Sequence, residues 1–324
     1  MNTQKTSIEK SNPKKGKNSI ALQNNFKNIK LAWQLYVLLL LPVIYIIMFA
    51  YVPMFGIQIA FKKFSATKGI WGSPWVGLRY FRFLQQEEFR QAFINTITVS
   101  VYSLVAGFPI PILLALGLNV MRNKAYKKTV QMVTYLPHFI STVVMVGILT
   151  QFFNTKVGLF KQIYDILFPN GSYDASPMGS ASAFQHLYVW SGIWQNMGWS
   201  TIIYLAALSN SDIEQTEAAI IDGATRLQRV WHIDIPTILP TAIILLIMNT
   251  GQLMNVGFEK VLLMQADTNL SKSQIISTFS YKRGIIMQQF ETGTAIGLFN
   301  SVINLILLVS VNAISRRVSE TSLW

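Results

Sequence analysis

The stretch Tyr36-Val37-Leu38-Leu39-Leu40-Leu41 lies within a run, residues 31–61, that contains no Asp, Glu, Lys or Arg. About 20 residues are enough for a helix to cross the hydrocarbon core of a bilayer, where only helices and closed barrels satisfy the backbone. The stretch lacks the period-two alternation of a barrel strand. It therefore predicts a transmembrane helix.

Five further runs are equally free of charged side chains. The sequence is 51% hydrophobic and 13% charged over 324 residues, whereas about 25% charged is usual in soluble domains. We therefore predict an all-α, polytopic membrane protein with six transmembrane helices. The five runs are residues 91–121, 129–155, 175–211, 235–258 and 292–315.

The basic residues indicate how the chain is oriented. They cluster before the first run, in the link 122–128 and at Arg316-Arg317. Six helices place these three clusters on one face, which the positive-inside rule predicts to be cytoplasmic. Both termini are then cytoplasmic. Residues 77–83, between the first two runs, alternate rings with charges and predict a helix that lies in the outer membrane interface.

These features divide the chain into five predicted parts. The first is poor in large apolar residues and carries no signal-peptide pattern, so the first helix should remain as an anchor. The parts are a disordered basic cytoplasmic tail (1–30), the first transmembrane helix (31–61), an extracytoplasmic interfacial segment (62–90), a transmembrane core (91–315) and a cytoplasmic tail (316–324).

Several kinds of chemistry are absent from the sequence. There is no cysteine, and His138, His186 and His232 stand without a second ligand at metal-binding spacing. No Gly-x-x-x-x-Gly-Lys phosphate loop occurs, and the six runs contain no Asp, Glu, Lys or Arg that could couple ions. We predict no catalytic and no metal site. If the chain moves a solute, the energy must come from another subunit.

One charged segment separates the fourth and the fifth of the six apolar runs. Between Asp212 and Asp234 the chain has five acidic side chains and two arginines, although its net charge is +13. Such a segment cannot lie in lipid. It must face water and offers itself to a partner.

The segment carries helix signals. Ser211, three residues before Glu214, predicts a capping box, and Gly223 predicts the end of that helix. A second short helix should then run over residues 224–231 until Pro236 breaks it before the next membrane helix. Asp222 either contacts the partner or caps the second helix, and the cap is the preferred interpretation.

The spacing within this segment resembles a known family. Glu-Ala-Ala, a glycine six residues after the Glu, nine further residues and then Ile-x-Leu-Pro is typical of the inner-membrane permease subunits of binding-protein-dependent ABC importers. The chain departs only in having Ile235 in place of the leucine. The matching positions, which the resemblance implies couple to the ATPase, are Glu217, Ala218, Ala219, Gly223, Ile233 and Pro236, with Asp222 beside them.

Further residues resemble the carbohydrate-uptake branch of that family. Asp222, Ala224 and Pro240 match this branch around the segment. Within it, the chain looks like the subgroup for complex or acidic oligosaccharides, such as alginate or pectin fragments. The likeness to this subgroup is carried by Tyr135-Leu136-Pro137 and Gly257-Phe258-Glu259, whereas Trp75-Val76-Gly77-Leu78-Arg79-Tyr80 and Asn95-Thr96 resemble sugar permeases as a whole.

The resemblance implies an assembly. The core, with a coupling loop at 211–236, would form half of the translocation path in a bacterial cytoplasmic (inner) membrane. A second and different permease subunit, two cytoplasmic ATP-binding subunits and an extracytoplasmic sugar-binding protein would complete it. The chain would need no cofactor, because the ATPase partner binds ATP and Mg, and it would contact an oligosaccharide and membrane lipid but no nucleic acid.

A sugar path needs polar groups and flat rings at membrane depth. Uncharged polar residues also join neighbouring helices, and tryptophans also mark the membrane interface, so both interpretations stay open. Asn249, Gln252 and Asn255 are three apart and should share one helix face. The candidates for the substrate path are these three with Trp190, Trp194 and Asn196.

Two other functions remain as alternatives. A self-contained secondary carrier or channel would need an ion site or pore charges inside the bundle, and the charge-free runs offer none. An enzyme acting on lipid-linked sugars would need a carboxylate or histidine cluster. Glu87-Glu88 is the only candidate pair, and adjacent helical residues point in different directions.

Overall fold

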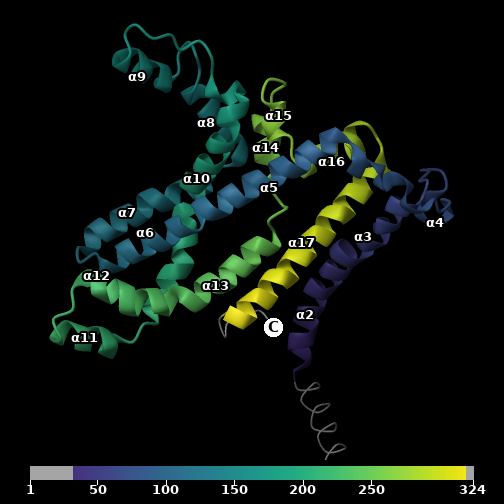
Figure 1. The fold of residues 1–324 in the computed structure, drawn as a ribbon. Coiled ribbons are helices and arrows are strands. Elements are labelled where there is room, and N and C mark those ends of the chain that lie inside the picture. The colour runs from purple at the N-terminus through teal and green to yellow at the C-terminus, as the bar shows by residue number, and fades with distance from the viewer. Residues whose placement is uncertain (1–31, 319–324) are drawn as a thin grey trace, which may run out of the picture. The chain divides into compact units, whose positions relative to one another are not determined.

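The computed structural model of this chain describes residues 32–318. The described part is helical throughout (Figure 1), apart from its loops and an isolated β-bridge between Lys62 and Trp75. Contacts divide the chain into two units, residues 1–57 and 58–324, and each is described by itself. The tail predicted for residues 1–30 lies outside the described residues.

The first unit contains helices α2 (Trp33–Ile46) and α3 (Val52–Met54) with a π turn, Ile47–Tyr51, between them. Helical residues continue to Phe61, and the path from Trp33 to Phe61 is long and apolar enough to cross a membrane. The π turn comes directly before Val52-Pro53, and the N–H of Val52 reaches back five residues to the carbonyl of Ile47. The wider turn makes room for a proline without ending the helix.

The second unit is a bundle of long helices joined by short ones. Its turn helices are Gly77–Gln85, Leu136–Phe139, Pro177–Gly179, Val230–Asp234 and Lys282–Ile286. Its α-helices are α4 (Gly69–Gly72), α5 (Glu87–Gly107), α6 (Pro109–Val120), α7 (Lys124–Tyr135), α8 (Thr142–Phe152), α9 (Leu159–Leu167), α10 (Ala181–Ser209), α11 (Ile213–Ile221), α12 (Arg226–Arg229), α13 (Ile235–Gly251), α14 (Phe258–Met264), α15 (Leu270–Ser273), α16 (Ile276–Tyr281) and α17 (Phe290–Val318).

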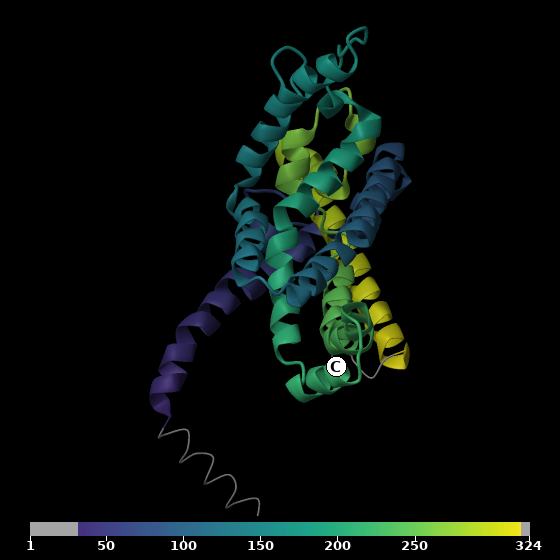
Figure 2. The same cartoon turned by 90° about the vertical axis from the view of Figure 1, so that its left-hand side faces the viewer.

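Helix α10 lies at the centre of this bundle. It packs against α5, α6, α7 and α13, and α13 packs along α17. Figures 1 and 2 show α11 and α12 at one end of the bundle and α9, α14 and α15 at the other. We call these the loop end and the far end.

Four continuous helical paths of the described residues could cross a membrane, or five if the bent pair Lys124–Phe139 and Thr142–Phe152 counts as one. The pair bends by 101°. Pro137 lies in the intervening turn, and Ser141 starts α8 by accepting the N–H of Val144 at 3.4 Å. Helix α10 matches another predicted run but is more polar, so six spans remain a prediction.

A close approach fixes α10 against α7. At Gly198 in α10, an added Cβ would lie 2.1 Å from the backbone oxygen of Thr134 and 2.9 Å from the Tyr135 ring. Only glycine lets the two backbones pack this closely. These two helices therefore contact each other through main chain.

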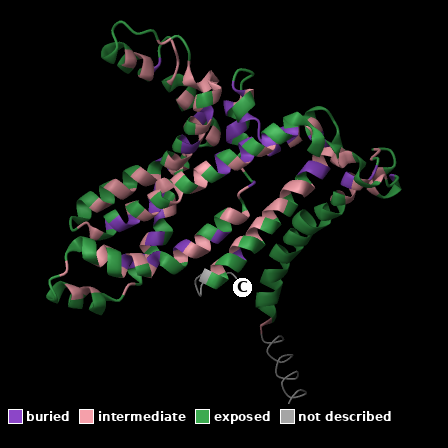
Figure 3. Cartoon of the chain, in the orientation of Figure 1, coloured by how far each residue is buried: buried purple, intermediate pink, exposed green. Residues whose placement is uncertain are grey.

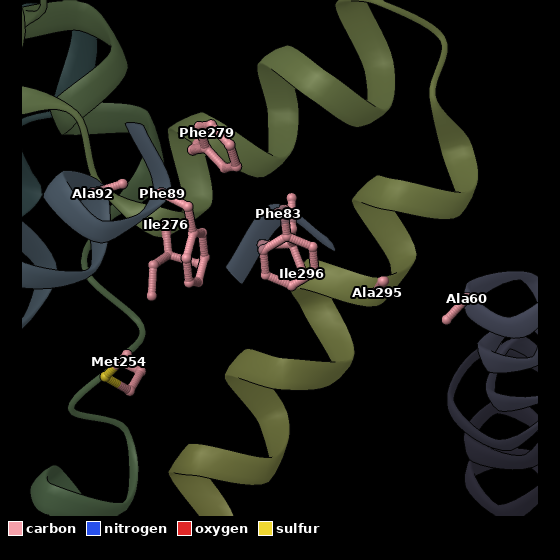
Figure 4. Packing of buried hydrophobic residues seen from close by; sticks show 9 residues of the cluster. All are labelled: Ala60, Phe83, Phe89, Ala92, Met254, Ile276, Phe279, Ala295 and Ile296. Atoms are coloured by element: carbon pink, nitrogen blue, oxygen red, sulfur yellow. The ribbon is translucent and has the colours of Figure 1, made fainter. Parts of the chain in front are cut away.

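Three clusters of buried apolar side chains hold the second unit together. Figure 3 shows the buried residues, polar and apolar, as short patches along the bundle, whereas α9 and α11 contain no buried residue. The largest cluster is shown in Figure 4, where Phe89 lies between Phe83, at 4.6 Å between ring centroids, and Phe279, at 5.8 Å. Such ring pairs add specificity to apolar packing.

The predicted interfacial segment is helical but tighter than an α-helix. Arg79 and Arg82 of the turn helix Gly77–Gln85 are exposed, while Phe83 reaches the core. Glu291 at the start of α17 fastens the segment, because its Oε1 accepts the N–H of Phe64 at 3.1 Å and the hydroxyl of Tyr80 at 3.5 Å.

Candidate functional site

The charged segment forms a projecting helix at the loop end. Helix α11 ends as predicted, because Gly223 has a φ of +80° that side chains other than glycine rarely adopt. The predicted start was wrong by one residue. The N-cap is Asp212, whose carboxylate accepts the N–H of Glu214 at 2.9 Å, so Ser211 makes no capping box.

The second half of the loop corrects two further predictions. Thr225, and not Asp222, caps α12, in a capping box with Gln228. Pro236 does not end the helix, because a π turn, Val230–Asp234, joins α12 directly to α13. In this turn the N–H of Ile235 donates to the carbonyl of Val230. The path from Arg226 to Gly251 is therefore one membrane-length helix.

The loop presents apolar side chains to its surroundings. Ile221 is 85% exposed and Leu227 is 76% exposed, and Ile213 and Trp231 are similarly open. Glu217, Ala218 and Gly223 are exposed too. Exposed apolar groups clustered on a charged projection are typical of a protein-binding surface.

Beneath the loop lies a cavity of about 710 Å³, lined by Glu217, Arg122, Arg226 and Arg229 among others. The Nε of Arg229 is buried without a hydrogen-bond partner among the described residues. Glu217 belongs to none of the three ion pairs of the described part. Its carboxylate thus lies in a basic setting and is free to pair with a group from outside.

The predicted polar cluster lines a cavity of about 470 Å³ between α5, α6, α10 and α13. Asn249, Gln252 and Asn255 all contribute to its wall. They do not share a helix face as expected, because α13 ends at Gly251. Successive turns preserve their spacing: Gln252 donates its N–H to Asn249 at 3.1 Å, and Asn255 to Gln252 at 2.9 Å.

Side chains of α17 hold the unwound segment, residues 252–257 between α13 and α14, in place. The Oδ1 of Asn255 accepts from the amides of Asn300 at 3.0 Å and Asn304 at 3.1 Å. The Oδ1 of Asn304 in turn accepts the N–H of Met254 at 3.0 Å. The amide network replaces backbone hydrogen bonds that the broken helix no longer makes.

A second cavity of about 490 Å³ adjoins the first, because Ser103, Gly107, Tyr188, Ser200 and Gly257 line both. Of the other predicted path residues, Asn196 lines this second cavity.

The tryptophans differ in whether they line one of these cavities. Trp190 and Trp194 line neither cavity; both are about half exposed, and Trp190 donates its indole N–H to Tyr102 at 2.8 Å. Trp199 lines the first cavity and stacks on His138, with ring centroids 4.5 Å apart. His138 is also hydrogen-bonded to Asn196 at 3.0 Å.

Sequence reasoning missed Lys260, a buried lysine in the wall of the second cavity. Lys260 is 9% exposed, and its Nζ donates to the carbonyl of Tyr188 at 2.9 Å and lies 4.9 Å from the centre of that ring. Burial lowers the pKa of Lys260, which lies in α14 outside the membrane-spanning helices, to about 8. Because the residue lies just after the run 235–258, its place in the sequence indicates a loop and not a cavity wall.

The chain matches, over residues 107–320, the family described as binding-protein-dependent transport system inner membrane component. This match covers more than half of the chain, so the chain belongs to that family. It is a permease of the sugar ABC importers, an inner-membrane protein with several apolar helices, and as a permease subunit it is not itself an enzyme. The family identification from the coupling-loop residues is thereby confirmed.

Two relatives from Bacillus subtilis (strain 168) cover nearly the whole chain. Protein LplB is 40% identical over 90% of this chain and 91% of its own length. The polygalacturonan/rhamnogalacturonan transport system permease protein YteP is 38% identical over 91% of this chain and 92% of its own.

The chain is also similar to chains of two solved ABC transporter structures. A crystal structure of a bacterial ABC transporter involved in the import of the acidic polysaccharide alginate contains a chain that is 36% identical, with a TM-score of 0.83, over 91% of this chain and 99% of the other. A second structure of an alginate transporter, with an alginate pentasaccharide-bound periplasmic protein, matches with the same score and identity over 92% and 99%.

Proposed function

We propose that this chain forms half of the translocation path for an acidic oligosaccharide of the pectin or alginate type. The observation that carries the proposal is the cavity lined by Asn249, Gln252, Asn255 and Trp199. Amides match sugar hydroxyls, and a flat ring matches a sugar face. The names of the similar proteins, which concern polygalacturonan, rhamnogalacturonan and alginate, support an acidic cargo.

The energy enters through the coupling loop. Glu217 anchors a cytoplasmic ATPase subunit, Ala218 and Ala219 allow it close contact, and Gly223 sets the bend. The side chain of Asp222 caps neither α11 nor α12 and is free for the same contact, while Ile233 and Pro236 join the loop to α13. Two ATPase subunits bind ATP and Mg, so this chain needs no cofactor. The exposed apolar side chains of α11 and α12 support this assignment.

The remaining partners follow from the family. A second, different permease subunit supplies the other half of the path, and an extracytoplasmic sugar-binding protein delivers the cargo to the far end of the bundle. Both termini lie in the cytoplasm, on the same side as the loop end. The binding protein in the alginate transporter structure supports this arrangement.

The test uses the complete transporter reconstituted in liposomes with its binding protein. Gly223→Val should abolish most oligosaccharide uptake while ATP hydrolysis continues, because a β-branched side chain is strained at a φ of +80° and misdirects the loop. Gly223→Asn, which tolerates this region better, should retain intermediate uptake. Wild-type uptake by the valine variant, or uptake without any ATPase, would sink the proposal.

A further inference from the structure

Lys260 is buried without the partner that a buried charge normally has. Among the described residues, three ion pairs occur, and none includes Lys260. Its ammonium has three donors, and the structure gives one of them an acceptor, the carbonyl of Tyr188 at 2.9 Å. An unpaired charge in such a place costs free energy, and groups of this kind concentrate at functional sites.

The amine stands where a passing solute would meet it. Lys260 and Asn196 line the second cavity, which shares a wall with the cavity of the polar cluster. Two glycines keep the space beside it open. A Cβ at Gly192 would lie 3.2 Å from the Lys260 Nζ, and one at Gly257 would lie 3.0 Å from the Tyr188 hydroxyl.

Another buried lysine shows what a purely structural role looks like. Lys62 is 3% exposed and donates to the carbonyl of Ile70 at 2.9 Å, but two indole rings cover its amine, with centroids 4.7 and 5.8 Å away. Those rings, Trp75 and Trp71, satisfy the cation from two sides. Lys260 has one ring and an open cavity on another side.

We infer that Lys260 receives a carboxylate of the cargo and makes the path selective for acidic over neutral oligosaccharides. The inference rests on the proposed function. The two free N–H donors of the ammonium match the two oxygens of a uronate carboxylate, and partial desolvation strengthens the pairing. The ring of Tyr188, held by a hydrogen bond from Gly257 at 3.0 Å, offers a face to the same sugar.

Glu259 is the charge that opposes this role. Glu259 lines the same cavity but is exposed, so water screens its charge. Because the two residues are adjacent on α14, their side chains point about 100° apart around the helix axis. Its removal therefore provides a matched control. Glu259→Gln should keep or increase the preference for an acidic cargo, whereas Lys260→Gln should remove it.

The experiment compares trigalacturonate with its neutral methyl ester in the complete reconstituted transporter. The binding protein is saturated with each sugar, so that uptake reports the path. Lys260→Gln should lower uptake of trigalacturonate at least tenfold and uptake of the ester less than twofold. Lys260→Arg should restore most of the difference. Lys272→Gln, an exposed lysine of α15, should change neither rate.

Each outcome decides the inference. An equal loss for both sugars, or no loss, overturns it, as does a wild type that prefers the ester. If Lys260→Gln does not assemble with the ATPases, Gly192→Ala is tested in its place. The added methyl group pushes the Lys260 amine aside while its charge remains. This variant should lower uptake of trigalacturonate more than uptake of the ester, by a smaller factor than Lys260→Gln. A wild type that moves neither of these sugars, and no alginate trisaccharide either, refutes the proposed function, and the inference with it.

Discussion

Among the glycines of the described residues, Gly198 leaves the least room for an added Cβ, which would lie 2.1 Å from the main-chain oxygen of Thr134. Gly198→Ala should destabilise the protein by about 1–3 kcal/mol, because the main chain at Thr134 cannot move aside for a methyl group. The measurement is the thermal unfolding of the purified complex in detergent. Gly147→Ala in α8 is the control, since nothing lies within 4 Å of the added Cβ and alanine favours a helix. An equal effect of both variants would contradict the close-contact argument.

Single residues were predicted unevenly from the sequence. Gly223 was identified because a positive φ at a helix end leaves few other choices. The cap was displaced from Ser211 to Asp212 because both side chains can accept the same N–H, and spacing alone does not separate them. Lys260 was missed because charge was counted along the chain, whereas its burial comes from α14 packing on α10.

At the scale of elements, α11 depends on its cap. Asp212→Ala should cost the helix about 1 kcal/mol, because the Glu214 N–H loses its acceptor. The frayed helix should bind the ATPase less tightly, which copurification at graded salt concentrations measures. For the stability of the loop, Asp222→Ala is the comparison, because that side chain caps neither helix; it is no control for ATPase binding, to which Asp222 is assigned. A loss of loop stability from Asp222→Ala and none from Asp212→Ala would show that the caps are assigned wrongly.

The unwound segment after α13 depends on α17. Asn304→Leu should leave the N–H of Met254 without an acceptor and cost about 1–3 kcal/mol. Uptake should fall while ATPase binding is retained, because the change lies far from α11. For the unfolding temperature, Asn249→Leu serves as the comparison, since it removes a cavity amide without touching this network; its uptake is no control, because Asn249 is assigned to the path. If Asn304→Leu left both the unfolding temperature and uptake unchanged, the network would not hold the segment.

Prolines show why element boundaries were harder to predict than elements. Pro236 was expected to end a helix, yet a π turn precedes it, as another precedes Pro53. In both cases the residue before the proline bonds five residues back, which moves the carbonyl away from the ring. Each apolar run contains most or all of a long helix or a bent helix pair of the structure, but nothing in a run predicts which turn will widen, and the number of spans stays a prediction.

At the scale of the whole molecule, the absence of cysteine makes the orientation testable. Single cysteines can be introduced one at a time and labelled by a membrane-impermeant maleimide in intact spheroplasts. Lys68→Cys should react from outside, whereas Lys127→Cys and Gln215→Cys should react only after lysis, because the link 122–128 and the coupling loop are predicted to be cytoplasmic. The reverse pattern would invert the proposed orientation.

The class of the molecule could be predicted because its evidence is local in sequence. The loop spacing identified the family, and composition identified a helical membrane protein. Of the residues predicted for the substrate path, Asn249, Gln252, Asn255 and Asn196 line the two cavities and Trp190 and Trp194 do not, and contact with a substrate stays a prediction for all six. Which face of a long, nearly uniform apolar helix meets a cavity depends on its neighbours, and periodicity in such a helix is weak.

The backbone contact at Gly198 also constrains how this protein can change over generations. Whatever sugar is imported, position 198 is closed to any residue with a side chain, because the obstacle is main chain and no compensating substitution at Thr134 removes it. Asn249 and Gln252 line the cavity and take no part in the amide network that binds Asn255, so these two positions can vary with the cargo. Permeases that diverged toward different sugars should therefore keep the glycine and vary at these two positions.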